Sequence, residues 1–516
     1  MKMARYYAQL LVYIAITAGV YFIFADFARL RLNTADASTY LNIAENIASH
    51  KGFVTSFNLY QYFTTLYHPI WPYMQFLYPL LCSFVFMLHG GIEQVIKVNI
   101  LILGINSALV FYIIQRFMPT RFNVLFISFL VFSSNFFISA LYPWTEQFYF
   151  LCFIITFILF LKYSGSPKGL MWLGFLNAAL MLLRAAHLYN FLGFLPVLFI
   201  GKDPLSRKFE RVLYFAGAFI LAYGLYQLFC LMVYHVFYPE YAQPGISYGL
   251  ARITGGIIYN PDHAGIQILA GPLFSLKSFF CVGEHLRDFC RQMPVLLWPA
   301  FFYYFLPAEK RTDGGLVALC FFQSIFTVLG YSVTFYWLPY HFESLRYSLV
   351  PYALMGLAGW YCLYQGLSLA GSRWKNLAVG LITVVLLYPQ VSKFIAFKAD
   401  FLQRPLWGIP YYKDLLEAYR WIDKNLPKEI LVASDEDQEG YFMHRPFIST
   451  PPGASFNCTN LALYNHIYSP DYYLLSSQAS DACFTPIVHT TVFSNRSFKL
   501  LKITNAAPKP GLISQP

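Results

Sequence analysis

Apolar runs long enough to cross a lipid bilayer recur from residue 7 to residue 391 and leave the chain few available folds. A helix needs roughly 20 apolar residues to span the hydrocarbon core. Only 12% of the 516 residues are charged, against about 25% in soluble domains. We therefore predict an integral membrane protein of mainly α fold, a polytopic helical bundle with about eleven spans. The predicted spans are 7–27, 98–115, 122–141, 147–161, 170–183, 188–200, 212–236, 294–306, 314–332, 349–364 and 377–391.

Basic residues between the runs indicate the orientation, because cytoplasmic loops are enriched in Lys and Arg. Lys2 and Arg5 precede the first run and place the N-terminus in the cytoplasm. The run 71–88 is broken by Pro72 and Pro79, so the sequence alone allows it to span or to lie in the interface. We adopt the non-spanning reading, because it places all the basic loops in the cytoplasm. These loops are 116–121, 162–168, 202–211, 310–311 and 373–375.

The sequence pattern changes near residue 399, where short strand-like runs replace the long apolar runs. We predict a transmembrane domain over 1–398, with outer loops at 28–97 and 237–293, and an extracytoplasmic α/β domain over 399–505. The remaining segment, 506–516, is expected to be a disordered tail. The prediction is a multi-pass inner (plasma) membrane protein whose C-terminal domain is periplasmic or extracellular.

Within this C-terminal domain, a helix is expected at 411–426, with Pro427 as its stop. The expected strands are 430–433, 447–449, 472–476, 487–493 and 498–503. Cys458 and Cys483 also fall in the domain. Outside the cytoplasm these two cysteines could form a disulfide.

The sequence lacks the motifs that are typical of several functional classes. The net charge of +11 could suggest a nucleic-acid partner, but the basic residues are spread between apolar runs rather than gathered on one face, so no nucleic acid is predicted. The sequence has no Walker loop and no GxGxxG motif, which argues against a nucleotide-binding domain. The nine cysteines include no CxxC pair with zinc-site spacing.

The segment 33–53 is the first polar segment after an apolar run, and Asp36 lies near its N-terminal end. Apolar residues at helical spacing and Gly52 at the expected end predict a short amphipathic helix along the membrane surface. Asp36 could simply offset the helix dipole. It also lies close to Arg29 and Arg31, so it could instead serve chemistry on an anionic lipid.

Two more charged residues interrupt the apolar runs, where charges are costly. Glu146 lies at the outer end of a span, either as a functional acid or as an interfacial acid within an aromatic belt that includes Tyr142 and Trp144. Arg184 lies between two short runs. It could snorkel to the interface or bind a phosphate or carboxylate.

Other candidate ligands lie in the outer segments. Lys277, Arg287 and Arg291 belong to a loop that could equally be an ordinary solvated one. Arg346 begins a span from the outer side, against the usual distribution of positive charge. His68 lies near the broken run and could contact a lipid headgroup or be structural.

Four segments together resemble the polytopic GT-C glycosyltransferases of the protein O-mannosyltransferase and aminoarabinose transferase type. TADASTYLNIAENIASHKGF with YHPIWPYMQFLYPLL is similar to the first outer loop of that family, and LYPWTEQFYFL to its second acidic loop. WLGFLNAALMLLRAAHLYNFLGFLPVL resembles its glycine-rich segment with a basic residue. ESLRYSLVPYAL resembles its late RY-x-x-x-P element. The segments occur in the family's order.

The resemblance implies an enzyme that transfers a sugar from a polyprenyl-phosphate donor to a glycan, lipid or protein acceptor on the outer face of the bilayer. It implies Asp36 as the catalytic base and Glu146 as the second acid, where the family more often has Asp. Arg184 and Arg346, together with the loop cations, would bind the donor phosphate, and Tyr40, Tyr347 and His68 would contact substrate.

Many relatives carry two adjacent acids in the first loop, whereas Ala35 and Ala37 flank Asp36 here. This departure weakens the case for a divalent cation, and no other cofactor is expected. The rival predictions are a transporter or lipid-linked sugar flippase, whose charges would line a pathway, and a non-catalytic polysaccharide assembly subunit.

Overall fold

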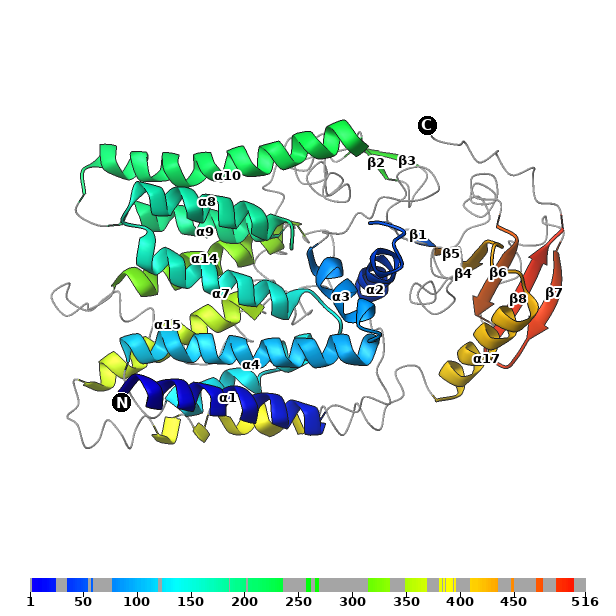
Figure 1. Ribbon diagram of the computed structural model, residues 1–516, viewed down its shortest axis with the longest axis horizontal. Coiled ribbons are helices and arrows are strands. Elements are labelled where there is room, and N and C mark those ends of the chain that lie inside the picture. The colour runs from blue at the N-terminus through cyan, green and yellow to red at the C-terminus, as the bar shows by residue number, and fades with distance from the viewer. Residues whose placement is uncertain are drawn as a thin grey trace. The chain divides into compact units, whose positions relative to one another are not determined.

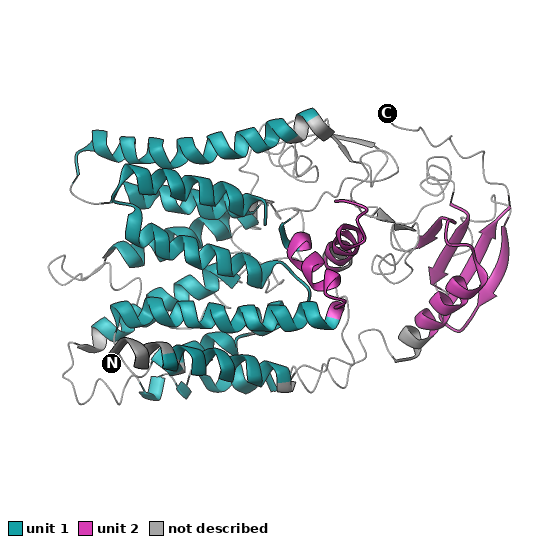
Figure 2. Ribbon diagram, viewed as in Figure 1, with its two compact units in different colours: residues 1–27, 75–78, 93–397 teal, residues 28–74, 79–92, 398–516 magenta. Residues whose placement is uncertain are grey.

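A computed structural model describes residues 2–24, 35–53, 57–58, 77–118, 123–184, 186–200, 203–234, 257–260, 265–268, 314–334, 349–368, most of 380–395, 409–434, 447–449, 470–476 and 489–504. The chain forms two compact units (Figure 2). The first comprises residues 1–27, 75–78 and 93–397, and the second comprises residues 28–74, 79–92 and 398–516.

The first unit is a bundle of apolar helices (Figure 1). Its described helices are α1 (Lys2–Phe24), α4 (Ile92–Phe117), α5 (Asn123–Val131), α6 (Ser134–Leu141), α7 (Glu146–Tyr163), α8 (Pro167–Met181), α9 (His187–Leu198), α10 (Leu205–Tyr234), α14 (Gly314–Thr334) and α15 (Leu349–Ser368). A short antiparallel pair, β2 (Ile257–Asn260) and β3 (Gly265–Ile268), falls in the same unit. The predicted mainly helical fold is confirmed for the described residues.

Three described helices are long and apolar enough to cross a membrane by themselves: Ile92–Phe117, Glu146–Tyr163 and Leu205–Phe229. Shorter apolar helices accompany them, including residues 380–392, which match the predicted span 377–391. On α10, Leu213 is 71% exposed and Ile220 is 66% exposed. Large apolar side chains facing outward are expected where lipid is the solvent. The predicted span 294–306 lies outside the described residues.

One predicted span, 122–141, is divided into two short helices. α5 ends at Val131 and α6 begins at Ser134. At this end the Leu130 carbonyl accepts from both the Ser133 hydroxyl at 2.6 Å and the Ser133 backbone N–H at 3.0 Å. The sequence marks this break with three consecutive polar residues, Ser133, Ser134 and Asn135, which the prediction of a single span did not use.

Glycines let neighbouring helices of the bundle approach closely. A Cβ added at Gly174 in α8 would lie 2.4 Å from the Phe215 carbonyl oxygen of α10. A Cβ at Gly193 in α9 would lie 2.8 Å from the Cα of Gln323 in α14. Small residues at helix contacts are typical of membrane bundles, where packing rather than water exclusion drives association.

Three basic residues at helix ends gather at one end of the bundle. Arg116 and Lys162 occupy the last turns of α4 and α7, and Lys168 lies at the start of α8. In Figure 1 these three helix ends lie at one end of the bundle, which also holds the N-terminus. Glu146, the first residue of α7, lies at the opposite end.

The second unit contains α2 (Ala35–Ala48), most of α3 (Leu77–Met87), α17 (Ile409–Asn425) and a six-stranded sheet. The strand order is β1-β5-β4-β6-β8-β7. The strands are β1 (Phe57–Asn58), β4 (Val432–Ser434), β5 (Phe447–Ser449), β6 (Tyr472–Ser476), β7 (His489–Ser494) and β8 (Phe498–Ile503). The first four in this order pair in parallel, and β8 and β7 are antiparallel to their neighbours.

The amphipathic helix α17 packs on β7 and β8. Ala418 and Ile422 are fully buried, one helical turn apart, so they belong to the face that packs inward. The predicted helix and all the predicted C-terminal strands are present, with small shifts at their ends. The sequence did not predict β1, which comes from the first outer loop and pairs with β5 far along the chain.

Candidate functional site

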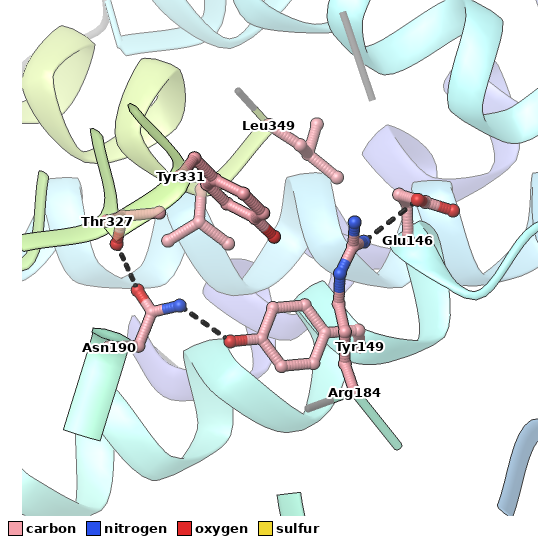
Figure 3. Close-up of a pocket in the computed structure, with 8 residues that line it drawn as sticks. Glu146, Tyr149, Arg184, Asn190, Thr327, Tyr331 and Leu349 are labelled. Atoms are coloured by element: carbon pink, nitrogen blue, oxygen red, sulfur yellow. Dashed lines mark hydrogen bonds and ion pairs between the residues drawn. The ribbon is translucent and has the colours of Figure 1, made fainter. Parts of the chain in front are cut away.

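A pocket lies where the ends of α7, α8, α9, α14 and α15 meet (Figure 3). It contains about 230 Å³ of space, including the part open to solvent. α7 supplies the first-turn residues Glu146 and Tyr149, and Arg184 follows the end of α8. The remaining lining residues are Asn190, Thr327, Tyr331, Leu349 and Val350. All of them belong to the first unit.

Glu146 and Arg184 form an ion pair in this pocket. The Arg184 guanidinium donates to Glu146 Oε1 at 2.8 Å. The Glu146 side chain is 3% exposed and that of Arg184 is 11% exposed, so water screens the pair much less than it would at a surface. Neither an isolated interfacial acid nor a snorkelling arginine describes this arrangement. The structure therefore brings together two charges that lie far apart in the sequence.

Local structure fixes both charged residues. Glu146 opens α7 just after Thr145, whose carbonyl accepts from the Tyr149 backbone N–H at 2.8 Å. The Arg184 N–H donates to the Leu180 carbonyl at 3.1 Å, and the Arg184 carbonyl accepts from His187 at 2.9 Å. Arg184 therefore lies in a tight hydrogen-bonded connection between α8 and α9. This backbone leaves the guanidinium close to the start of α7 (Figure 3).

The aromatic residues before α7 pack inside the protein. Tyr142 and Trp144 are each 5% exposed and stack with ring centroids 4.8 Å apart. The Tyr142 carbonyl also accepts from Asn99 Nδ2 at 2.8 Å. These contacts hold the segment that leads into Glu146, whereas the sequence interpretation had allowed an ordinary lipid-facing aromatic belt.

A buried polar network, which sequence reasoning missed, lies beneath the ion pair. It consists of Asn177, His187, Tyr149, Asn190 and Thr327, joined by hydrogen bonds of 2.7–2.9 Å. A signal was present in the sequence, because residues 184, 187 and 190 are all polar at helical spacing within an apolar stretch.

The other predicted site residues are placed only in part. Lys277, Arg287, Arg291, Arg346, Tyr347 and His68 lie outside the described residues, as do Cys458 and Cys483. Asp36 belongs to α2 of the second unit, but its side chain is not described. Tyr40, in the same helix, is 6% exposed. Within the described part of the chain no cluster of three His, Cys, Asp or Glu residues could hold a metal ion.

The fold of the chain is similar to that of two solved membrane proteins. ArnT from Cupriavidus metallidurans, solved with bound undecaprenyl phosphate, matches with a TM-score of 0.59 at 11% identity, over 97% of this chain and 99% of ArnT. The archaeal oligosaccharyltransferase AglB from Archaeoglobus fulgidus, solved with an inhibitory peptide and a dolichol-phosphate, matches with a TM-score of 0.53 at 12% identity, over 91% of this chain and 69% of AglB. No family model and no curated sequence matches the chain.

Proposed function

We propose that this protein is a membrane glycosyltransferase that moves a sugar from a polyprenyl-phosphate donor to an acceptor on the outer face of the bilayer. The observation that carries the proposal is the Glu146–Arg184 pair in a pocket at one end of a GT-C-type bundle. The basic turns lie at the opposite end, which supports an outward-facing pocket under the positive-inside rule. The likeness to two transferases solved with lipid phosphates supports the donor class.

The pocket has the charge and dipole arrangement that a phosphate needs. Arginine binds phosphate through several charge-assisted hydrogen bonds, because its planar guanidinium carries five N–H donors, and Arg184 places this group in the pocket. The N-terminal ends of α7, α9 and α15 meet around it, together with the C-terminal ends of α8 and α14, and the three N-termini favour an anion. Leu349 and Val350 give part of the wall an apolar surface suited to a lipid chain.

The transfer step follows from these groups. A hydroxyl oxygen of the acceptor bonds to the anomeric carbon of the sugar, and the bond from that carbon to the phosphate oxygen breaks. The electron pair leaves on polyprenyl phosphate, whose negative charge Arg184 stabilises. Asp36 accepts the hydroxyl proton as general base. Glu146 orients Arg184 by the ion pair and is the second acid of the site.

The remaining candidates extend this assignment. Arg346, with Arg287, Arg291 and Lys277 of the outer loop, would add cations to the donor phosphate, and His68, Tyr40 and Tyr347 would contact substrate. The second unit, with its C-terminal sheet, is proposed to lie outside the cytoplasm, where Cys458 and Cys483 would form a disulfide. A non-reducing peptide map should then recover these two cysteines linked.

The deciding experiment measures release of polyprenyl phosphate from a panel of polyprenyl-phosphate sugars by the purified protein. Asp36→Asn should abolish release while the protein stays folded and inserted. Asp203→Asn is the matched control, since Asp203 pairs with Arg211 at 2.8 Å in a half-buried position beside the basic turns; it should retain release within about twofold.

Two outcomes would contradict the proposal. Full turnover by Asp36→Asn would remove Asp36 as the base. Donor binding without release in the presence of acceptor extracts, combined with movement of the donor across the bilayer of proteoliposomes, would favour the flippase. Sugar-dependent release that disappears in Asp36→Asn would support the transferase and identify the sugar.

A further inference from the structure

The Tyr149 hydroxyl is the centre of the buried network beneath Arg184. Tyr149 is 4% exposed, and its oxygen lies 2.8 Å from His187 Nδ1. The same oxygen accepts from Asn190 Nδ2 at 2.7 Å. Asn190 Oδ1 in turn lies 2.8 Å from the Thr327 hydroxyl on α14. The network therefore joins α7, α9 and α14 through neutral polar groups.

Asn177 sets the direction of these hydrogen bonds. Its Nδ2 donates to the Leu173 carbonyl at 2.7 Å, and a carbonyl oxygen only accepts. Asn177 Oδ1 therefore faces His187 Nε2 at 2.9 Å. Because Oδ1 is also only an acceptor, Nε2 must carry a hydrogen.

His187 is then a neutral ring with an open lone pair on Nδ1. A second ring proton would place a charge among Asn177, Tyr149 and other neutral groups in a fully buried site, where an unpaired charge is very costly. Nδ1 therefore accepts from the Tyr149 hydroxyl. The Tyr149 oxygen keeps its lone pairs for Asn190, and every hydrogen bond at Tyr149 in the described structure has a defined direction.

Tyr149 is also in contact with the charged pair. The Arg184 guanidinium lies over the Tyr149 ring at 5.8 Å from its centroid, within the range of a cation–π contact. Tyr149 and Glu146 are three residues apart in α7 and share one helical face. In Figure 3 the guanidinium lies between the Glu146 carboxylate and the Tyr149 ring.

We propose that Tyr149 and His187 are positioning residues that hold the Arg184 guanidinium for the donor phosphate, through a network whose direction is fixed by Asn177. This inference rests on the proposed function for the identity of the ligand. Hydrogen bonds to His187 and Asn190 hold the Tyr149 hydroxyl in place. They therefore fix the plane of the ring that the Arg184 guanidinium contacts. Glu146 holds the other side of the guanidinium by the ion pair, so the planar group keeps one orientation.

A double-mutant cycle tests this inference with undecaprenyl phosphate as the probe, bound to purified protein in nanodiscs of neutral lipid. Tyr149→Phe keeps the ring and removes only the hydroxyl. We expect it to weaken binding about tenfold in the wild-type protein and less than about twofold in the Arg184→Lys background, since lysine lacks the planar group that the ring orients. Equal losses in the two backgrounds, or no loss in the wild type, would overturn the inference.

Tyr21→Phe is the matched control. Tyr21 is fully buried in α1, and its hydroxyl donates to the Val131 carbonyl at 2.5 Å, outside the residues that line the pocket. It should leave undecaprenyl phosphate affinity unchanged. A loss equal to that of Tyr149→Phe would assign both effects to general stability and overturn the positioning role.

NMR of protein labelled in its histidine rings gives a readout that needs no ligand. The His187 signal, assigned by its absence in His187→Phe, should report the neutral Nε2–H form. An Nδ1–H form or a charged ring would overturn the network. A wild-type protein that binds no undecaprenyl phosphate would instead overturn the proposed function, and the two failures are therefore distinguishable.

Discussion

The ion pair between Glu146 and Arg184 makes single substitutions at either residue ambiguous. Both side chains are largely buried and 2.8 Å apart. Removing one partner leaves the other charge uncompensated, which typically costs about 3–5 kcal/mol. A loss of activity in Arg184→Ala could therefore reflect unfolding as well as a lost phosphate ligand.

We predict that the double variant Glu146→Gln/Arg184→Met separates these effects. It removes both charges, so its thermal unfolding temperature should lie near that of the wild type, whereas Arg184→Ala alone should unfold several degrees lower. Neither variant should bind undecaprenyl phosphate with wild-type affinity. Thermal unfolding in detergent and binding assays measure the two properties. A double variant with wild-type affinity would return Arg184 to a purely structural role.

The side-chain amide of Gln323 forms no hydrogen bond within the described structure. It is fully buried in α14, and neither Nε2 nor Oε1 has a hydrogen-bond partner among the described residues. An unsatisfied buried amide costs about 1–3 kcal/mol. Gln323→Met should therefore raise the unfolding temperature. Asn190→Leu is the comparison, because it breaks two hydrogen bonds and should lower it. A lower temperature for Gln323→Met would indicate a bound water or other partner.

Close packing of α9 against α14 depends on glycine on both helices. The Cβ of an alanine at Gly330 would lie 2.2 Å from the Tyr189 ring, and at Gly193 it would lie 2.8 Å from the Gln323 Cα. A ring carbon next to the backbone and a Cα atom cannot move aside without shifting the helix. This contact also carries Thr327 and Asn190, so the helix spacing sets the geometry of the pocket wall.

We predict that Gly330→Ala destabilises the protein by about 1–3 kcal/mol, the usual cost of overpacking. Gly224→Ala on α10 is the control, because nothing lies within 4 Å of its added Cβ and alanine favours helix over glycine by up to about 1 kcal/mol. Unfolding temperatures of the two variants should therefore move in opposite directions. A Gly330→Ala protein as stable as Gly224→Ala would show that α9 and α14 are less tightly packed than described.

The distribution of charge over the bundle predicts the orientation of the whole molecule. The basic turns gather with the N-terminus at one end, and the pocket lies at the other. A membrane-impermeant maleimide should therefore label a cysteine at Glu93, in the first turn of α4, in intact cells in a background lacking the natural cysteines, and should not label one at Lys168 until the membrane is opened. The reverse pattern would contradict both the topology and the outward-facing pocket.

Periodicity and composition made most elements predictable. The amphipathic helix α17 follows from its helical spacing, since burial of one face leaves a local pattern, and β6 follows from a short continuous apolar run that is buried on both faces. The break between α5 and α6 was not predicted, because the apolar residues of 122–141 outweighed the three polar residues Ser133, Ser134 and Asn135 at the break. The sequence analysis identified Glu146 and Arg184 separately, as charges that are costly within apolar sequence, but it did not predict that they form a pair.

The class of each element, the membrane setting and the charged candidates follow from local sequence, because hydrophobic length and helical period are properties of neighbouring residues. Which distant residues meet is set by the tertiary packing. It placed Arg184 against Glu146 and joined His187 to Tyr149. It also paired β1 with β5. Such contacts depend on how helices and strands pack across the chain, and no local pattern records that packing.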